Sequence, residues 1–497
     1  MQPDSLFAAY AEVAAARGDA PALVDADGAV LSHVALVGLA GRFAAWLRRA
    51  GVMPGERVVV QVDKSVGAVA LYLGCLQAGA VFVPLNTAYT DAEVGYFLND
   101  CQPALFVHAP GRAGLWGASV ALGTSAAEGL WAEALALESD AAIAPRGCDD
   151  LAAICYTSGT TGRSKGAMIS HGNLLSNART LIGLWRFTAE DRLLHVLPIF
   201  HVHGLFVALH CALLSGACLL FEHGFDVGRT RERLRGASVL MGVPTHYTRL
   251  LAEAEFGADD CAGVRLFISG SAPLLAEVHR QFTARTGAVI LERYGMTEAG
   301  MITSNPYDGA RVAGTVGFAL PGVELRVRGG EGALVGAGET GVLEIRGPNV
   351  CSGYWQMAEA SSGGFTADGW FITGDMVVMD GDGRVTIVGR AKDLIIAGGF
   401  NIYPKEVEEV IDALPGVEES AVIGIPHPDF GEGVVAVVVP RAGAGLTADL
   451  VLDGVRPALA RFKHPRAVHI VPALPRNAMG KVQKNLLRAA RQALFKR

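Results

Sequence analysis

The sequence predicts an α/β fold: a large N-terminal domain of layered, mostly parallel sheets with helices, a small β subdomain, and a small α+β C-terminal domain. Three observations support this. The chain has 497 residues, which is too many for a single core. Strand-like apolar runs alternate with helix-length intervals, a pattern typical of βα units. The pattern changes near Thr315 and again after Arg390, so we expect domains at 1–390 and 391–497.

Alternating elements are expected from residue 57 onward. A capping box at Thr90-Asp91-Ala92-Glu93 should open a helix toward Asp100, and a helix is expected over Val66–Ala78. Another helix start is expected near Asn173. The expected strands are Arg57–Val62, Val81–Val83, Ala104–Val107, Leu151–Tyr156, Leu193–Val196, Ala217–Phe221, Ser238–Met241, Val264–Ile268 and Val289–Leu291.

Shorter elements are expected in the last third of the chain. Glycine-punctuated strands at Val323–Val327, Val342–Ile345 and Arg384–Val388 indicate a small antiparallel subdomain. Pro404 suits the first turn of a helix. Strands at Ser420–Ile425 and Val434–Val439, a helix through Leu459, and a loop and helix after Pro475 should follow.

Composition narrows the classes of function. The net charge of −7 and a pI near 6.0 give no reason to expect nucleic acid or an acidic membrane as partner. The apolar stretches 65–90 and 202–221 are broken by glycine, which favours buried α/β layers over membrane spans. The start of the sequence lacks a secretory pattern, and the eight cysteines are scattered. We therefore expect a cytoplasmic protein.

The segment from Tyr156 to Gly166 is the strongest functional signal. It follows a predicted strand and contains three glycines, five aliphatic hydroxyl side chains and two cations. Small residues let backbone N–H groups approach an anion, so the segment is suited to polyphosphate. Lys165 is followed by Gly166, unlike the lysine of P-loop NTPases. A solvated linker is the alternative.

Four other motifs accompany this loop. They are Tyr294-Gly295-Met296-Thr297-Glu298 after a strand, Trp370 to Asp375, Gly389 to Asp393, and Arg476 to Lys481. Glu298 offers the oxygen ligand that Mg²⁺ prefers, and Asp375 can accept hydrogen bonds from a ribose diol. Each motif alone is compatible with an ordinary turn.

Together and in this order, the motifs resemble the acyl-adenylate-forming superfamily of acyl-CoA synthetases, adenylation domains and luciferases. The resemblance implies Mg²⁺, ATP and coenzyme A, with a mobile C-terminal domain. A carboxylate attacks ATP to give an acyl-adenylate, and a thiol then takes the acyl group. It assigns catalytic roles to Lys481, Thr297, Glu298 (with Mg²⁺) and His201. It assigns nucleotide contacts to Thr157, Ser158, Gly159, Thr160, Thr161, Gly162, Lys165, Gly270, Ser271, Ala272, Glu292, Arg293, Tyr294, Asp375 and Arg390.

The resemblance also implies a hinge at Lys392 and a thiol tunnel beside Gly398 and Gly399. His201 matches a gate between the acyl site and this tunnel; His201-Val202-His203 on a strand could instead bind metal or simply pack. Ser164 departs from the family's usual proline. Lys481 is an expected target of a lysine acetyltransferase, since acetylation would remove its charge.

Arg293 suggests which class of carboxylic acid the protein activates. A guanidinium in the acyl pocket is costly unless an anion meets it, so we expect a dicarboxylate. A surface pair between Arg293 and Glu292 is the alternative. The Glu-Arg-Tyr-Gly-Met-Thr-Glu form resembles malonyl-CoA synthetases, which predicts malonate. An acetate- or propionate-activating synthetase, a carrier-loading adenylation enzyme and a catalytically silent nucleotide-binding regulator are the competing interpretations.

Overall fold

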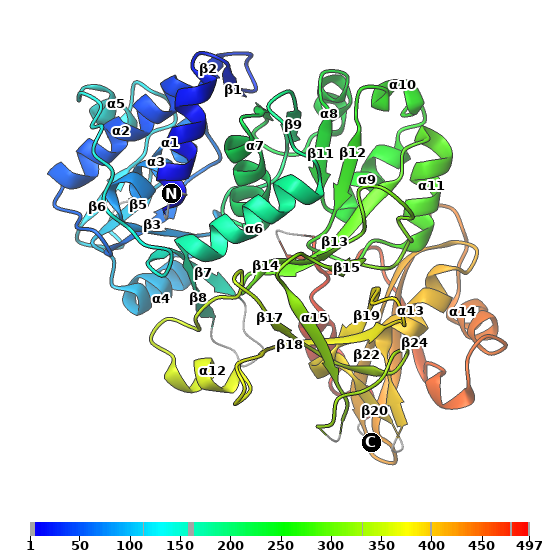
Figure 1. The fold of residues 1–497 in the computed structure, drawn as a ribbon. Helices are drawn as coiled ribbons and strands as arrows, with labels where there is room; N and C mark the ends of the chain where they lie inside the picture. Colours follow the sequence, from blue (N-terminus) through cyan, green and yellow to red (C-terminus); the bar gives the residue numbers. More distant parts are fainter. Residues whose placement is uncertain are drawn as a thin grey trace.

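A computed structural model describes residues 5–112, 114–157, 164–330, 332–397, 400–477 and 480–495. Within these ranges residues 21–319 build two large sheets, and the later segments form two smaller ones (Figure 1). No helix in these ranges is long and apolar enough to span a bilayer.

The larger sheet has nine strands in the described residues, in the order β15-β14-β13-β12-β11-β9-β10-β1-β2. The central strands pair in parallel, and the pairs at both edges are antiparallel. The strands are β1 (Pro21–Val24), β2 (Val30–Ser32), β9 (Arg192–His195), β10 (Cys218–Phe221), β11 (Val239–Gly242), β12 (Leu266–Ser269), β13 (Ile290–Met296), β14 (Gly300–Ser304) and β15 (Phe318–Ala319).

The second sheet runs β6-β5-β3-β4-β7-β8 and is parallel as far as β7. β7 and β8 form an antiparallel pair at its edge. The strands are β3 (Arg57–Gln61), β4 (Val81–Pro84), β5 (Leu105–His108), β6 (Ser119–Ala121), β7 (Leu151–Thr157) and β8 (Lys165–Ser170).

Local sequence signals explain where the helices of this part begin and end. α3 starts after the Ser65 cap and ends at Gly79 in the left-handed conformation, and the predicted Thr90 capping box opens α4. The helices are α1 (Leu6–Arg17), α2 (His33–Arg49), α3 (Val66–Ala78), α4 (Asp91–Cys101), α5 (Gly129–Leu135), α6 (His171–Leu184), the π-helix η1 (His203–Ala208), α7 (Leu209–Ser215), α8 (Val227–Leu234), α9 (Pro244–Ala252), α10 (Ala258–Cys261) and α11 (Ala276–Thr286).

The main core joins the two sheets through helices. Its largest cluster takes residues from both sheets and from α1, α2, α3, α6 and α7. α3 is buried on all sides, which explains its uncharged sequence. The charge-free stretch 65–90 is therefore a buried helix, turn and strand, as expected.

The predicted antiparallel subdomain is confirmed. It consists of β16 (Glu324–Arg328), β17 (Thr340–Arg346), β18 (Phe371–Met379) and β19 (Val385–Arg390), with the short helix α12 (Ala358–Gly363) nearby. The last hundred residues, at the lower right of Figure 1, contain η2 (Ala391–Asp393), β20 (Ile395–Ala397), β21 (Phe400–Ile402), α13 (Pro404–Asp412), β22 (Val417–His427), β23 (Gly431–Pro440), α14 (Ala448–Val455), η3 (Arg461–Lys463), β24 (Ala467–Ile470) and α15 (Lys484–Ala489).

Several sequence-based boundaries were wrong. α6 starts at His171 because Ser170 caps it, and Asn173 is the reciprocal residue of that capping box. β13 does not stop at Leu291 but continues to Met296, because pairing with β14 supports the added residues. α14 ends at Val455, before Leu459.

Candidate active site

The base of the predicted phosphate loop is the β7–β8 pair. Thr157 lies opposite Lys165, and its Oγ1 donates to the Lys165 carbonyl at 3.4 Å. The Tyr96 hydroxyl donates to the Ser164 carbonyl at 2.9 Å, which anchors the chain where a proline was expected. The other loop candidates, Ser158, Gly159, Thr160, Thr161 and Gly162, lie outside the described residues.

Thr297 and Glu298 lie on the turn between β13 and β14. The sequence predicted that this motif follows a strand, but Tyr294 to Met296 are still part of β13. Glu298 is buried, and its Oε1 accepts a 3.0 Å hydrogen bond from the Tyr354 hydroxyl. Burial raises the pKa of Glu298, while Tyr354 and the charges of Arg390 and Lys481 oppose that shift. A buried carboxylate of this kind fits Mg²⁺, which takes few protein ligands when phosphates supply the others.

Asp375 and Arg390 face each other on adjacent strands. Arg390 Nε lies 2.7 Å from Asp375 Oδ1, and the Tyr294 hydroxyl donates to the other carboxylate oxygen. Burial raises the pKa of Asp375, whereas Arg390 and Tyr294 lower it. This pairing brings together the predicted ribose contacts and Tyr294.

Lys481 reaches the same region from the C-terminal segment. Its backbone N–H donates to Asn477 Oδ1 at 3.0 Å. A Cβ on the preceding Gly480 would lie 3.3 Å from Thr245 Oγ1 at the start of α9, so this loop contacts the N-terminal part of the protein. The Lys481 residue is exposed to solvent, yet desolvation by the surrounding protein lowers the pKa of its ammonium group. The charge of Arg390 lowers this pKa further, whereas Asp375 and Glu298 raise it.

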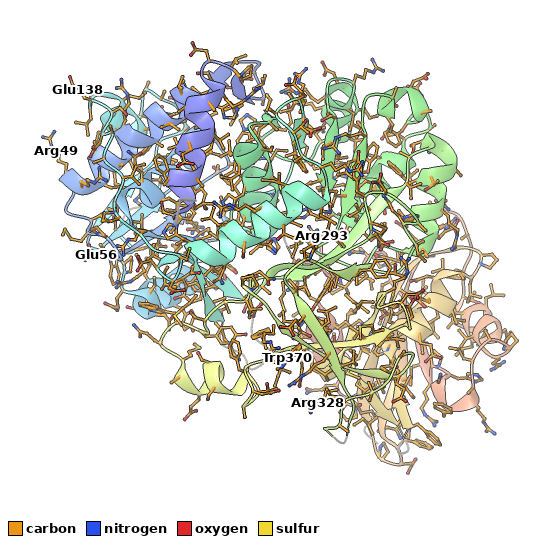
Figure 2. All side chains as sticks on the ribbon, in the orientation of Figure 1. Arg49, Glu56, Glu138, Arg293, Arg328 and Trp370 are labelled. Carbon is orange, nitrogen blue, oxygen red and sulfur yellow. The ribbon has the colours of Figure 1, made fainter. Side chains whose placement is uncertain are left out.

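Arg293 is a deeply buried charge. It is only 4% exposed and therefore lies in the interior, and Figure 2 labels it near the middle of the view. Its Nε and one Nη have no hydrogen-bond partner among the described residues. Burial lowers its pKa to about 9. Gly270 makes room for it: a Cβ at Gly270 would lie 2.2 Å from Nη1 of Arg293.

The alternative pairing of Arg293 with Glu292 at the surface was wrong. Neighbouring side chains of a strand point to opposite faces, so these two cannot meet. Glu292 is also buried, and its Oε1 accepts from the Gly314 N–H at 3.0 Å. Burial raises the pKa of Glu292 to about 8.

The two histidines of the H-x-H motif are not on a strand. His201 precedes the π-helix η1, and its carbonyl accepts from the Leu205 N–H. Burial, Lys481 and Arg293 lower the pKa of His201 to about 3, so its ring is neutral. His203 Nδ1 lies 3.2 Å from the Ser271 hydroxyl. Ser271 has a φ of 71°, a strained value typical of functional sites, and Ala272 follows it half-buried.

Of the residues predicted for the hinge and the thiol tunnel, the structure describes only the hinge residue. Lys392 lies on the 3₁₀ turn η2. Gly398 and Gly399 lie outside the described residues.

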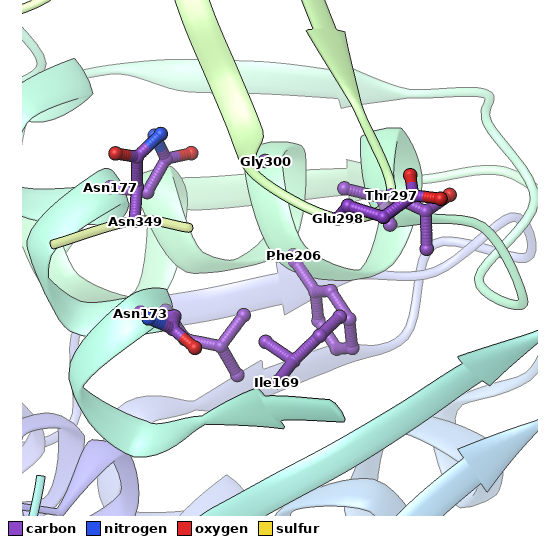
Figure 3. A pocket seen from close by; sticks show the side chains of 10 residues that line it. Ile169, Asn173, Asn177, Phe206, Thr297, Glu298, Gly300 and Asn349 are labelled. Carbon is purple, nitrogen blue, oxygen red and sulfur yellow. The ribbon is translucent and has the colours of Figure 1, made fainter. Parts of the chain in front are cut away.

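Two asparagines that the sequence interpretation did not single out support the Glu298 turn. Asn177 of α6 and Asn349 both donate to the Met301 carbonyl, at 2.8 and 3.0 Å, and Asn349 also bonds the Ala299 carbonyl. With Thr297 and Glu298 they line a cavity of about 10 Å³, room for about one water molecule (Figure 3). A polar residue on the inner face of α6 was a signal for Asn177; nothing in the sequence marked Asn349.

The arrangement can bring two anions together. Arg390 and Lys481 act on each other and on the carboxylates of Glu298 and Asp375, and Arg293 acts on Lys481. Such a group of fixed charges can neutralise phosphate and carboxylate groups as they react.

Comparisons with known families, sequences and structures identify the family of this chain. The AMP-binding enzyme family matches residues 10–355, and the AMP-binding enzyme C-terminal domain matches residues 406–481. A feruloyl-CoA synthase from an Amycolatopsis species is 36% identical over 93% of this chain and 94% of its own. Malonate–CoA ligase of Arabidopsis thaliana is 35% identical over 88% of this chain and 78% of its own. The crystal structure of ATP-bound MatB from Rhodopseudomonas palustris has 50% identity and a TM-score of 0.95, covering 99% of this chain and 100% of that one. The chain therefore belongs to the AMP-binding enzyme family, as an AMP-forming CoA ligase of the acyl-adenylate-forming superfamily.

Proposed function

We propose that this CoA ligase acts on malonate. One malonate carboxylate oxygen attacks the α-phosphorus of ATP, the bond to the β-phosphate oxygen breaks, and pyrophosphate leaves. The coenzyme A sulfur then attacks the acyl carbon of malonyl-AMP. The thioester bond forms, AMP departs, and the thiol loses its proton.

The buried guanidinium of Arg293, two of whose nitrogens have no hydrogen-bond partner among the described residues, is the observation that carries the choice of acid. A buried charge without a partner costs several kcal/mol, so a pocket for an apolar acid gains nothing from it. A second carboxylate would satisfy Arg293 through paired hydrogen bonds. Ferulate, for which the feruloyl-CoA synthase relative is named, has no second carboxylate. Malonate, for which the malonate–CoA ligase relative is named, has one.

The other site residues take their roles from the same proposal. Thr157, Lys165 and the loop between them hold the β- and γ-phosphates, and Thr297 holds the α-phosphate. Asp375 and Arg390 bind the ribose, while Gly270 to Ala272 and Glu292 to Tyr294 border the nucleotide. Glu298 holds Mg²⁺, which supplies positive charge to the phosphates when bound. Lys481 neutralises charge during adenylation, and acetylation by a lysine acetyltransferase would abolish that.

The same proposal places the domain boundary after Arg390 and the hinge at Lys392. Arg390 is tied to Asp375 on the N-terminal side, and Asp393 Oδ1 lies 2.8 Å from Arg488 Nη2 on the C-terminal side. Only Ala391 and Lys392 lie between these two ion pairs. Rotation there would remove Lys481 from the site and bring Gly398 and Gly399 to the thiol tunnel beside His201.

Pyrophosphate release with a panel of acids tests this function. Malonamate has an uncharged amide in place of the second carboxylate of malonate. The kcat/KM for malonate should exceed that for malonamate by about 10- to 150-fold, which corresponds to the loss of one charged hydrogen-bonded contact. Acetate, octanoate and ferulate should be poorer still, and methylmalonate and succinate would report the space around the acid. Equal use of malonate and malonamate, or better use of acetate, would refute the proposal in favour of a generic short-chain synthetase. Transfer to a carrier protein but not to free coenzyme A would indicate a carrier-loading enzyme.

A further inference from the structure

One short segment connects the two halves of the polyphosphate site. The Cys351 N–H donates to the Glu298 carbonyl at 2.7 Å, which attaches the segment to the turn of the Mg²⁺ candidate. The Trp355 N–H donates to the Gly166 carbonyl at 2.8 Å, which attaches it to the start of β8, beside Lys165. Residues 351–355 therefore link two motifs that are more than a hundred residues apart in the sequence.

The side chain of Tyr354 makes the same connection. Its hydroxyl donates to Glu298 Oε1 at 3.0 Å. The Lys165 ammonium lies 5.1 Å from the centre of its ring, within the range of a cation–π contact. One side chain thus touches both the carboxylate and the cation that the proposed function assigns to Mg·ATP.

We propose that Tyr354 is a positioning residue for Mg·ATP, through its hydroxyl on Glu298 and its ring on Lys165. The hydroxyl holds one oxygen of the Glu298 carboxylate and would leave the other available to Mg²⁺. Partners of metal ligands act in this way, and losing one typically costs 10- to 100-fold in metal affinity. This inference rests on the proposed roles of Glu298 and Lys165, but not on the identity of the acid.

The backbone around Tyr354 is fixed well enough for this role. The Tyr354 N–H donates to the Ser361 hydroxyl at 2.8 Å, and that hydroxyl donates to the Met357 carbonyl, also at 2.8 Å. Gly353 has a φ of 136°, and a Cβ there would lie 2.8 Å from Ser361 Oγ. A support held from several directions gives the precision that a binding site needs.

A packing role is the competing explanation, since Tyr354 also lies in a small apolar cluster with Ala167 and Cys351. The two explanations predict different effects of Tyr354→Phe on Mg·ATP binding, because this variant keeps the ring and the packing but removes the hydroxyl. They differ again for Tyr354→Leu, which also removes the ring that faces Lys165. Trp355→Phe is the matched control, because it changes the next aromatic residue, whose Nε1 bonds the Asp100 carbonyl instead.

Equilibrium dialysis of ATP against each full-length variant, without any carboxylic acid, tests the proposal. The dissociation constant is measured with Mg²⁺ and with EDTA, and their ratio is unaffected by any misfolded fraction. For Tyr354→Phe we expect the Mg²⁺-dependent gain to fall about tenfold while metal-free binding stays unchanged. Tyr354→Leu should in addition weaken metal-free binding about two- to fivefold, and Trp355→Phe should change neither.

A wild-type Mg²⁺ gain in Tyr354→Phe would overturn the proposal and leave Tyr354 as a packing residue. Equal losses in Tyr354→Phe and Trp355→Phe would also overturn it, because they would indicate a general displacement of the segment. The assay contains no malonate, so a wrong assignment of the acid would leave these outcomes unaffected.

Discussion

Replacing Arg293 by methionine should make the protein more stable and, at the same time, poorer at using malonate. The guanidinium is 4% exposed, two of its nitrogens are unpaired among the described residues, and burial lowers its pKa to about 9. At 1.36 kcal/mol per pH unit, keeping this charge costs on the order of 5 kcal/mol in the ligand-free protein. An apolar side chain of similar length should recover about 1–4 kcal/mol of that cost.

The assay can observe both effects. All six tryptophans precede residue 391, so intrinsic fluorescence during urea unfolding reports the part of the chain that contains Arg293. Arg293→Met should unfold at higher urea than the wild type, while its kcat/KM for malonate in pyrophosphate release falls about 10- to 150-fold. Discrimination between malonate and malonamate should disappear in the variant.

A second variant disturbs Arg293 without touching it. In Gly270→Ala the new methyl group would lie 2.2 Å from Nη1 of Arg293, so the guanidinium must move and malonate use should drop. Gly183→Ala adds the same methyl group where no atom lies within 4 Å, and it should have no effect on malonate use. A less stable Arg293→Met that still prefers malonate over malonamate would refute the reasoning.

Two more predictions concern Lys481 and Glu292. Lys481→Ala should reduce pyrophosphate release with malonate about 100-fold or more, yet still convert supplied malonyl-AMP to thioester; equal loss of both half-reactions would contradict the proposed hinge motion. Burial raises the pKa of Glu292 from 4.5 to about 8, so the folded state binds an extra proton between these values, and stability is lost as pH rises through that window. Glu292→Gln should therefore match the wild type at pH 5 and be more stable by about 2–4 kcal/mol at pH 8.5 in the same urea assay; identical curves at both pH values would exclude this titration.

The elements that could be predicted from the sequence are those whose ends are set by local chemistry. α3 occupies Val66–Ala78 as expected because Ser65 caps it and Gly79 takes the left-handed conformation that ends it. α13 begins at Pro404 for the same kind of reason. β13 was cut short because polar Glu292 and Arg293 interrupt its apolar pattern, and only pairing with β14 shows that the strand continues.

The candidate site divides in the same way. Motif residues such as Glu298, Asp375 and Lys481 could be named in advance because each motif is contiguous. The environment of Arg293 could not be predicted, because it depends on Gly270, which follows strand β12. It also depends on the alternation of side chains along β13, which places Glu292 on the opposite face. Tyr354 also escaped notice, because its two partners lie far away in the chain and meet it only in the folded protein.

The position of Arg293 also bears on how the proposed reaction avoids its own electrostatic barrier. Malonate brings two negative charges toward a triphosphate, and both cannot approach the α-phosphate without repulsion. The charge of Arg293 contributes to the lowered pKa of Lys481, and we propose that a short diacid places one carboxylate on each of these two cations. In this proposal, binding one carboxylate to Arg293 would remove that charge from the phosphates and direct the other toward Lys481. The buried arginine, costly in the free protein, would then both select the acid and orient it, because its cost is offset only when the second carboxylate arrives.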